Sequence, residues 1–178
     1  MKMSYLDVVI ETDRLILKPI SIQDKEDIFE NFTEDITKYM YPTAPKEIYE
    51  VENFINSSLK GLRENSNLQM VIRKKDTNEF IGNAGLHNTT SEIPELGIWI
   101  KKDAFGKGYG REAITAITEW AKSNLKVKYI TYPVDKDNIP SKKIPLSLGG
   151  KFIKEYEEET PDGRKLNIEE YYIEMPSH

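Results

Sequence analysis

The chain has 178 residues, 38% of them hydrophobic and 31% charged, a balance typical of one globular domain spanning residues 1–178. The absence of cysteine excludes disulfides, thiolate nucleophiles and cysteine-ligated metals, and two histidines are too few for a multi-histidine zinc site, so we expect no metal. A net charge of −5 argues against nucleic acid as a partner, and no apolar run resembles a membrane span or a signal peptide, so we expect a cytoplasmic protein.

The pattern of apolar residues in the first half of the chain predicts strands and helices in a definite order. Ser21 and Asp24 resemble a capping box, which starts a helix. After Pro45, apolar residues recur every three or four positions from Ile48 to Leu62, which defines one face of a second helix. The elements expected here are a strand at 14–19, helices from Ser21 and from about Pro45, and strands at 68–73, 80–86 and 95–100.

The second half predicts a long helix, a strand, a short helix and a final strand pair. The long helix runs from about Arg111 to Asn124, where apolar residues again repeat at three and four. A short helix from about Ser141 ends at Gly149 and Gly150. The remaining elements are strands at 127–134, 151–156 and 168–175. This order predicts a mixed α/β sheet with one parallel crossover around the long helix.

Three alternating glycines lie between the strand at 95–100 and the long helix, in the segment Phe105-Gly106-Lys107-Gly108-Tyr109-Gly110-Arg111. Glycines let backbone N–H groups approach a ligand closely, and a helix N-terminus adds free N–H groups and the positive end of the helix dipole. Such a loop suits a phosphate or pyrophosphate. The spacing fits neither the Walker loop nor the dinucleotide fingerprint. The alternative is a turn that the glycines merely tighten.

Ile98-x-Ile100 followed by the 105–110 segment resembles the acetyl-CoA motif of the GNAT N-acetyltransferase superfamily. Phe105 stands where that motif usually has Gln or Arg, and an aromatic residue before Gly-Lys-Gly-Tyr is similar to the ribosomal-protein alanine N-acetyltransferase (RimJ/RimL-type) branch. Further segments resemble that branch, in order along nearly the whole chain: residues 11–17, 81–88, 95–99, 138–141 and 148–150.

The resemblance implies a GNAT-like fold, which is a mixed, mostly antiparallel sheet of six to seven strands with a central splayed parallel pair, flanked by about four helices. It also implies acetyl-CoA as co-substrate and direct attack of a primary amine, on a small molecule or a peptide, through a tetrahedral intermediate. A homodimer stays open. The cofactor-binding residues that it implies are Ile98, Ile100, Phe105, Gly106, Lys107, Gly108, Tyr109, Gly110, Arg111, Asn138 and Lys143.

Two residues are implied to be catalytic. Glu95 would act as the base, directly or through water, and the alternative is a carboxylate that faces solvent or pairs with an arginine. Ser141 would protonate the departing thiolate, and the alternative is a helix N-cap. His87 is expected in a loop or in the acceptor pocket. A non-catalytic module that senses acyl-CoA, or a domain that binds no CoA, stays open as another function.

Overall fold

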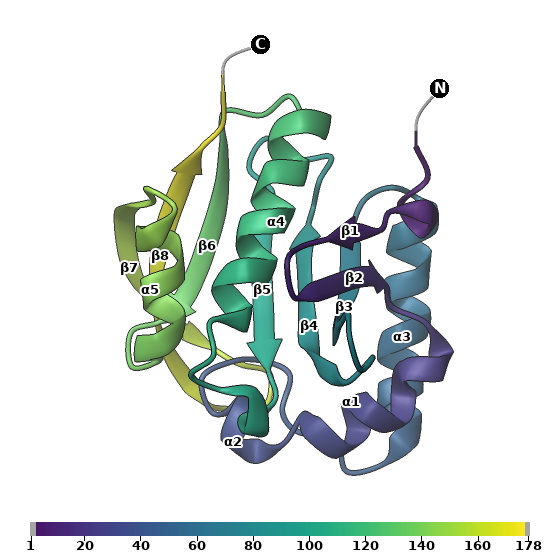
Figure 1. Ribbon diagram of the computed structural model, residues 1–178. Helices are drawn as coiled ribbons and strands as arrows, with labels where there is room; N and C mark the ends of the chain where they lie inside the picture. The colour runs from purple at the N-terminus through teal and green to yellow at the C-terminus, as the bar shows by residue number, and fades with distance from the viewer. Residues whose placement is uncertain (1–2, 177–178) are drawn as a thin grey trace.

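A computed structural model describes residues 3–176 (Figure 1). Within these residues, eight strands form one sheet in the order β1-β2-β3-β4-β5-β6-β8-β7, and every neighbouring pair is antiparallel except β5 and β6. The strands are β1 (Ile10–Glu11), β2 (Leu15–Pro19), β3 (Leu68–Lys74), β4 (Phe80–His87), β5 (Glu95–Ile100), β6 (Tyr129–Asp135), β7 (Lys151–Glu159) and β8 (Lys165–Glu174). The mixed, mostly antiparallel sheet with a central parallel pair is confirmed, with one strand more than the six to seven expected.

Helices cover both faces of the sheet. In Figure 1, α4 and α5 lie over the near face and α3 runs behind the sheet. In the described part of the chain the α-helices are α1 (Lys25–Asn31), α2 (Glu34–Thr37), α3 (Ile48–Arg63), α4 (Tyr109–Asn124) and α5 (Ile139–Ser147), with short 3₁₀ turns η1 (Tyr5–Asp7), η2 (Ile22–Asp24) and η3 (Lys102–Ala104). None of these helices is long and apolar enough to cross a bilayer.

Local sequence signals explain where the first helices begin. The Ser21 backbone N–H donates to the Asp24 carboxylate over 2.9 Å, which caps η2 and leads into α1. In the same way the Glu47 backbone N–H donates to the Glu50 carboxylate over 2.9 Å, so α3 begins at Ile48, three residues after the expected Pro45. The elements that the sequence did not predict, η1, β1, α2 and η3, are two to four residues long and too short to show a period.

Two helix starts differ from expectation. Helix α4 begins at Tyr109 rather than near Arg111, because Gly108 adopts φ = 78° and serves as its N-cap. Helix α5 begins at Ile139 rather than Ser141, with Asn138 as N-cap. Ser141 therefore lies in the first turn of α5, and its interpretation as the N-cap is wrong.

The end of α5 follows the expected glycine stop. Gly149 has φ = 76°, its N–H donates to the Leu146 carbonyl oxygen over 3.2 Å, and the Gly150 N–H donates to the Pro145 carbonyl oxygen over 2.8 Å. This is the Schellman arrangement, which satisfies carbonyl groups that the helix leaves free. Pro145 lies inside the helix.

Candidate active site

The glycine loop presents free backbone N–H groups at the start of α4. Gly106 and Gly108 both have positive φ, 76° and 78°, which residues with a side chain adopt only at a cost. None of the backbone N–H groups from Gly106 to Arg111 has a hydrogen-bond acceptor in residues 3–176. A Cβ added at Gly106 would meet no atom within 4 Å, so open space lies beside the loop. The geometry fits an anion such as pyrophosphate.

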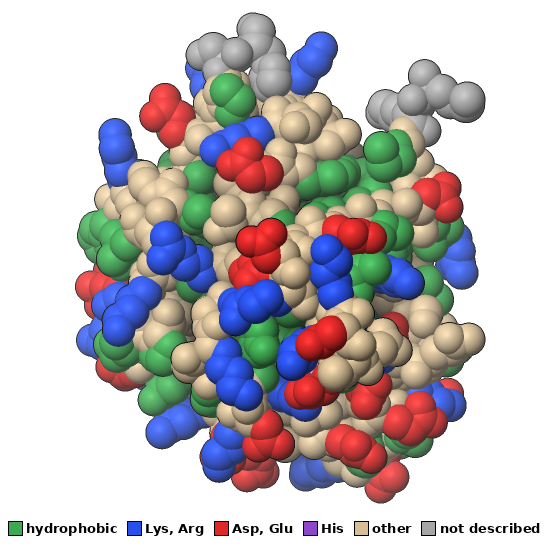
Figure 2. All heavy atoms as spheres, viewed as in Figure 1, with side chains coloured by type: hydrophobic (Ala, Val, Ile, Leu, Met, Phe, Trp, Pro, Cys, Tyr) green, Lys and Arg blue, Asp and Glu red, His purple; other side chains and the backbone are tan. Residues whose placement is uncertain are grey.

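Cationic side chains surround this loop. Lys107, Arg111 and Lys143 are exposed, and none of them forms an ion pair with a carboxylate of the described residues. Arg111 lines a hollow of about 470 Å³ beside the first turns of α4. Figure 2 shows Lys and Arg side chains gathered around the lower part of α4, where the helix starts. Phe105 is 54% exposed next to the loop, an apolar surface that a ligand could cover.

The loop is held in place by the N-terminal segment of the chain. The Glu112 carboxylate in α4 accepts hydrogen bonds from the Thr12 hydroxyl (2.5 Å), the Arg14 backbone N–H (3.0 Å) and Arg14 Nε (2.7 Å). The Arg14 guanidinium also lies 4.5 Å from the centre of the Tyr109 ring, which is buried. Of Tyr109 only the backbone therefore faces a ligand at the loop, and its side chain fixes the start of α4.

Strands β5 and β6 are paired at one point only. Glu95 lies opposite Thr131, whose backbone N–H donates to the Pro94 carbonyl oxygen over 2.9 Å. Beyond this point β5 and β6 are not paired with each other. On the α4 side, the Ile98 and Ile100 side chains pack against Gly110, where an added Cβ would come within 3.2 Å of Ile144. Gly110 therefore faces the packed side chains of β5 and α5, and a side chain there would displace Ile144 slightly.

Across this opening, Ser141 is bound to a residue that the sequence did not single out. The Ser141 hydroxyl lies 2.5 Å from the phenolic oxygen of Tyr132 in β6, and Tyr132 is 2% exposed. Burial raises the pKa of Tyr132 to about 12, so the phenol keeps its proton at neutral pH. Asn138 lies half-buried at the N-terminus of the same helix. The two hydroxyl groups form a pair that can donate a proton beside the open edge of β5.

On the opposite face of the sheet, Glu95 lies in an environment that favours its protonated form. Burial raises the pKa of Glu95, and the nearby carboxylates of Glu158 and Glu170 raise it further. Glu95 forms no ion pair with a lysine or arginine in residues 3–176, so its interpretation as the partner of an arginine is wrong. A carboxylate with a raised pKa beside the point where β5 and β6 separate is suited to act as a base.

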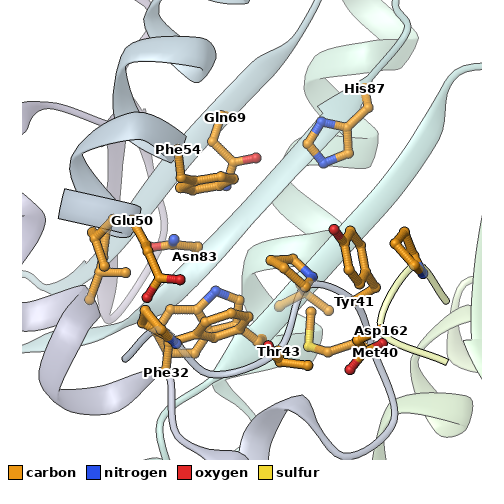
Figure 3. A pocket seen from close by; sticks show the side chains of 18 residues that line it. Phe32, Met40, Tyr41, Thr43, Glu50, Phe54, Gln69, Asn83, His87 and Asp162 are labelled. Carbon is orange, nitrogen blue, oxygen red and sulfur yellow. The ribbon is translucent and has the colours of Figure 1, made fainter. Parts of the chain in front are cut away.

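A cavity of about 500 Å³ lies on this same face. Gly97 in β5 lines the cavity, and Gly85 in β4 lies opposite Gly97 in the sheet, so the absence of both side chains leaves room for the ring of His87. The His87 ring leans over them, with Nε2 3.3 Å from the position of a Cβ at Gly97. Aromatic and aliphatic side chains from α1, α3 and the loop after α2 form the walls, and Figure 3 shows them around the cavity.

His87 is the last residue of β4 rather than a loop residue, and it lines this cavity. Burial lowers the pKa of His87, which makes the imidazole neutral at pH 7. His87 lies directly opposite Glu95 in the β4–β5 register, and opposite residues of an antiparallel pair share one face. Glu95 therefore adjoins the end of the cavity that His87 occupies.

The β7–β8 turn closes the cavity from the side. Arg164 donates from Nη1 to the Thr37 carbonyl oxygen and from Nη2 to the Met40 carbonyl oxygen, each over 2.8 Å. Its Nε donates to Asp162 over 2.7 Å, and Asp162 lines the cavity. A single arginine thus fastens the turn to the segment after α2. No motif in the sequence pointed to it, because its partners lie far away in the chain.

The glycine loop and the cavity are thus two candidate binding sites on opposite faces of one sheet. The described residues hold no cluster of three or more metal-ligating side chains. The family model for the acetyltransferase (GNAT) domain matches residues 14–151, and the chain belongs to this family. It is, by that membership, an N-acetyltransferase of the acetyl-CoA-dependent class.

Relatives and solved structures agree with this assignment. The chain is similar to the uncharacterized N-acetyltransferases YoaA of Bacillus subtilis (30% identity, covering 79% of this chain and 81% of that one) and p20 of Bacillus licheniformis (25%, covering 88% and 90%). A spermidine N-acetyltransferase from Vibrio cholerae in complex with CoA and spermine shares the fold, with a TM-score of 0.78, 21% identity and coverage of 92% and 97%. So does the Salmonella typhimurium acetyltransferase that modifies the N-terminal serine of ribosomal protein L7/L12, with a TM-score of 0.81, 11% identity and coverage of 95% and 100%.

Proposed function

We propose that this chain transfers the acetyl group of acetyl-CoA to a primary amine held in the cavity beside His87 and Glu95. The observation that carries the proposal is the position of Glu95. It lies where the opening between β5 and β6 begins and next to the end of the cavity. A cofactor arm in the opening and an amine in the cavity would therefore meet at this carboxylate.

The loop from Gly106 to Arg111 would hold the pyrophosphate of the cofactor through its free N–H groups, and Lys107, Arg111 and Lys143 would supply positive charge. The pantetheine arm would lie between two parts of the structure. One is the edge of β5 that β6 leaves unpaired, which contains Ile98 and Ile100, and the other is Asn138, the N-cap of α5. The backbone groups of β5 that β6 leaves unpaired support this placement, because they are free to bind a ligand.

Glu95 would accept the proton of the bound ammonium, directly or through water, and so release the nitrogen lone pair. The amine nitrogen then bonds to the thioester carbonyl carbon, and the oxygen of that carbonyl takes up the negative charge. When the tetrahedral species collapses, the carbon–sulfur bond breaks. The thiolate takes a proton from the hydroxyl pair of Ser141 and Tyr132, which lies on the other side of β5. The nitrogen gives up its second proton to water, and the hydroxyl pair regains a proton from water.

The face that receives the amine carries several carboxylates, among them Glu95, Glu158 and Glu170. Their negative charge would attract a cationic amine to the cavity. The solved neighbours include an enzyme for a polyamine and one for a protein N-terminus, so the acceptor of this chain can be a small-molecule or a peptide amine.

The test is a thiol-release assay with acetyl-CoA and a panel of amines, combined with equilibrium binding of CoA. Release of free thiol that depends on an amine, with formation of the N-acetyl product, is the expected result. Binding of acetyl-CoA without turnover of any amine would instead favour a non-catalytic sensor of acyl-CoA. Failure of CoA to raise the melting temperature would exclude both, because a ligand selective for the native state stabilises it.

A further inference from the structure

Asn83 lies in the middle of β4 and lines the cavity with both atoms of its amide free. The residue is 2% exposed, and neither Nδ2 nor Oδ1 has a hydrogen-bond partner in residues 3–176. Its cross-strand neighbours are Val71 in β3 and Trp99 in β5, and neither forms a hydrogen bond with the amide. A buried amide without a partner destabilises the fold relative to an apolar residue of the same size. Its presence therefore points to a ligand that supplies the missing bonds.

The cavity extends from Asn83 toward the reacting end. His87 lies four residues beyond Asn83 on the same face of β4, which corresponds to roughly 13 Å of strand. Gly97 in β5, which lies opposite the midpoint between them, also lines the cavity. In Figure 3, Asn83 lies toward one end of the cavity and His87 toward the other, with aromatic rings between and around them. An amine that reacts beside His87 and Glu95 would thus extend an apolar body toward Asn83.

The chemistry of an amide defines the group that fits it. Asn83 offers one donor and one acceptor side by side in a plane, and another amide presents the complementary pair. Glu50 also lines this end of the cavity, but its carboxylate is exposed and already accepts the N–H groups of Lys46 and Glu47. Water screens such a charge, so a second cation deep in the cavity would gain little from Glu50 and would lose its own hydration.

We propose, as an extension of the acetyl transfer proposed above, that Asn83 is a specificity-determining residue and that the preferred acceptor is an elongated primary amine with an apolar body and a neutral amide at its far end. The apolar walls bind the body, and Asn83 selects the amide through two hydrogen bonds. An acceptor that lacks the amide leaves Asn83 buried and unpaired, and it is discriminated against for that reason.

The experiment measures kcat/KM for ω-amino amides of increasing chain length, and for n-alkylamines and α,ω-diamines of the same lengths. The wild-type chain is expected to prefer the amide over the matched alkylamine by about tenfold or more at the best length. In Asn83→Leu this preference disappears through a rise in KM for the amide, while turnover of alkylamines is retained. Asn83→Asp keeps the shape of the side chain but is expected to shift the preference to the diamine.

The melting temperature separates a role in specificity from a structural role. Asn83→Leu removes an unpaired buried amide, so its melting temperature is expected to equal or exceed that of the wild-type chain, and a large decrease would contradict the inference. Equal kcat/KM for amides and alkylamines, a wild-type preference for diamines, or a preference for amides that persists in Asn83→Leu would each overturn the inference alone. Turnover of no amine by the wild-type chain would overturn the proposed function itself.

Discussion

Substitution of Gly106 tests whether the glycine loop binds pyrophosphate. Gly106 has φ = 76° and open space around the position of a Cβ, so a side chain there would point into the region assigned to the ligand. Asp and Asn have the same shape and are the residues that best tolerate positive φ. The variants Gly106→Asp and Gly106→Asn therefore share the conformational cost and differ only in charge.

The size of the expected difference follows from Coulomb's law. Two unit charges about 4 Å apart interact with ~1 kcal/mol in water, and the loop is exposed to solvent. A pyrophosphate with roughly two negative charges would then oppose the new carboxylate by about 2 kcal/mol, which corresponds to a ~30-fold weaker affinity. Closer approach or a lower local dielectric would enlarge this effect.

The assay is equilibrium titration of both variants with CoA at low and high ionic strength. We expect the Kd of Gly106→Asp to exceed that of Gly106→Asn by about 30-fold at low salt, and the difference to shrink as salt screens the charges. Equal Kd values for the two variants at low salt would refute the assignment of the loop, because the charge would then have no anion to repel. Thermal unfolding of both variants checks that each remains folded.

Five further substitutions test the catalytic residues and the cavity. Glu95→Gln should lower kcat by about 10²–10⁴-fold without changing the Kd of CoA. Glu158→Gln should lower the pKa of Glu95 and so move the acidic limb of the pH–kcat profile to lower pH. An acidic limb that stays at the wild-type pH would contradict the coupling between the two carboxylates. Arg164→Ala should raise KM for the amine and lower the free energy of unfolding, measured in urea, by about 1–3 kcal/mol, because hydrogen bonds to two carbonyl groups are lost. An unchanged KM would show that the β7–β8 turn does not shape the amine site. Tyr132→Phe and the matched variant Ser141→Ala should each lower kcat while the Kd of CoA stays constant. Full activity of both variants would exclude the hydroxyl pair as the proton donor.

The direction of the Glu95 effect follows from its environment. Burial and two neighbouring carboxylates raise the pKa of Glu95 above its ordinary value, so the group becomes a base only at a pH above that of an exposed glutamate. Because the folded state holds this proton more tightly than the unfolded state, ionisation of Glu95 destabilises the fold as pH rises through the raised pKa. Glu95→Gln should therefore be more stable than the wild-type chain at neutral pH and less active.

Most of the sheet and the long helices could be predicted because their apolar residues repeat with a clear period. Strand β5 and helix α3 are such cases. The sequence predicts the start of α5 two residues too late, because Ser141 is itself a good capping residue. Pro140, which prefers the first helical turn, marks the earlier start. Local patterns with two plausible caps do not determine which one is used.

The site divides in the same way. The glycine loop could be predicted, since its residues are consecutive in the chain. The position of the His87 ring depends on the register that places Gly85 opposite Gly97, and the closure of the cavity depends on Arg164, whose acceptor on Thr37 lies 127 residues away. Neither the strand register nor the hydrogen bonds of Arg164 can be recognised from a local pattern in the sequence. The partner of Ser141, the buried phenol of Tyr132, likewise came from the packing of α5 on β6.

The central claim is that an amine in the cavity attacks an acetyl thioester beside Glu95. The measurement that tests it most directly is the single-turnover rate of N-acetyl product formation from acetyl-CoA and an amine, compared between the wild-type chain and Glu95→Gln with both proteins saturated with acetyl-CoA. The claim predicts product in the wild-type chain and a rate about 10²–10⁴-fold lower in the variant. Equal rates in the two proteins, or no product from any amine in the wild-type chain, would contradict it.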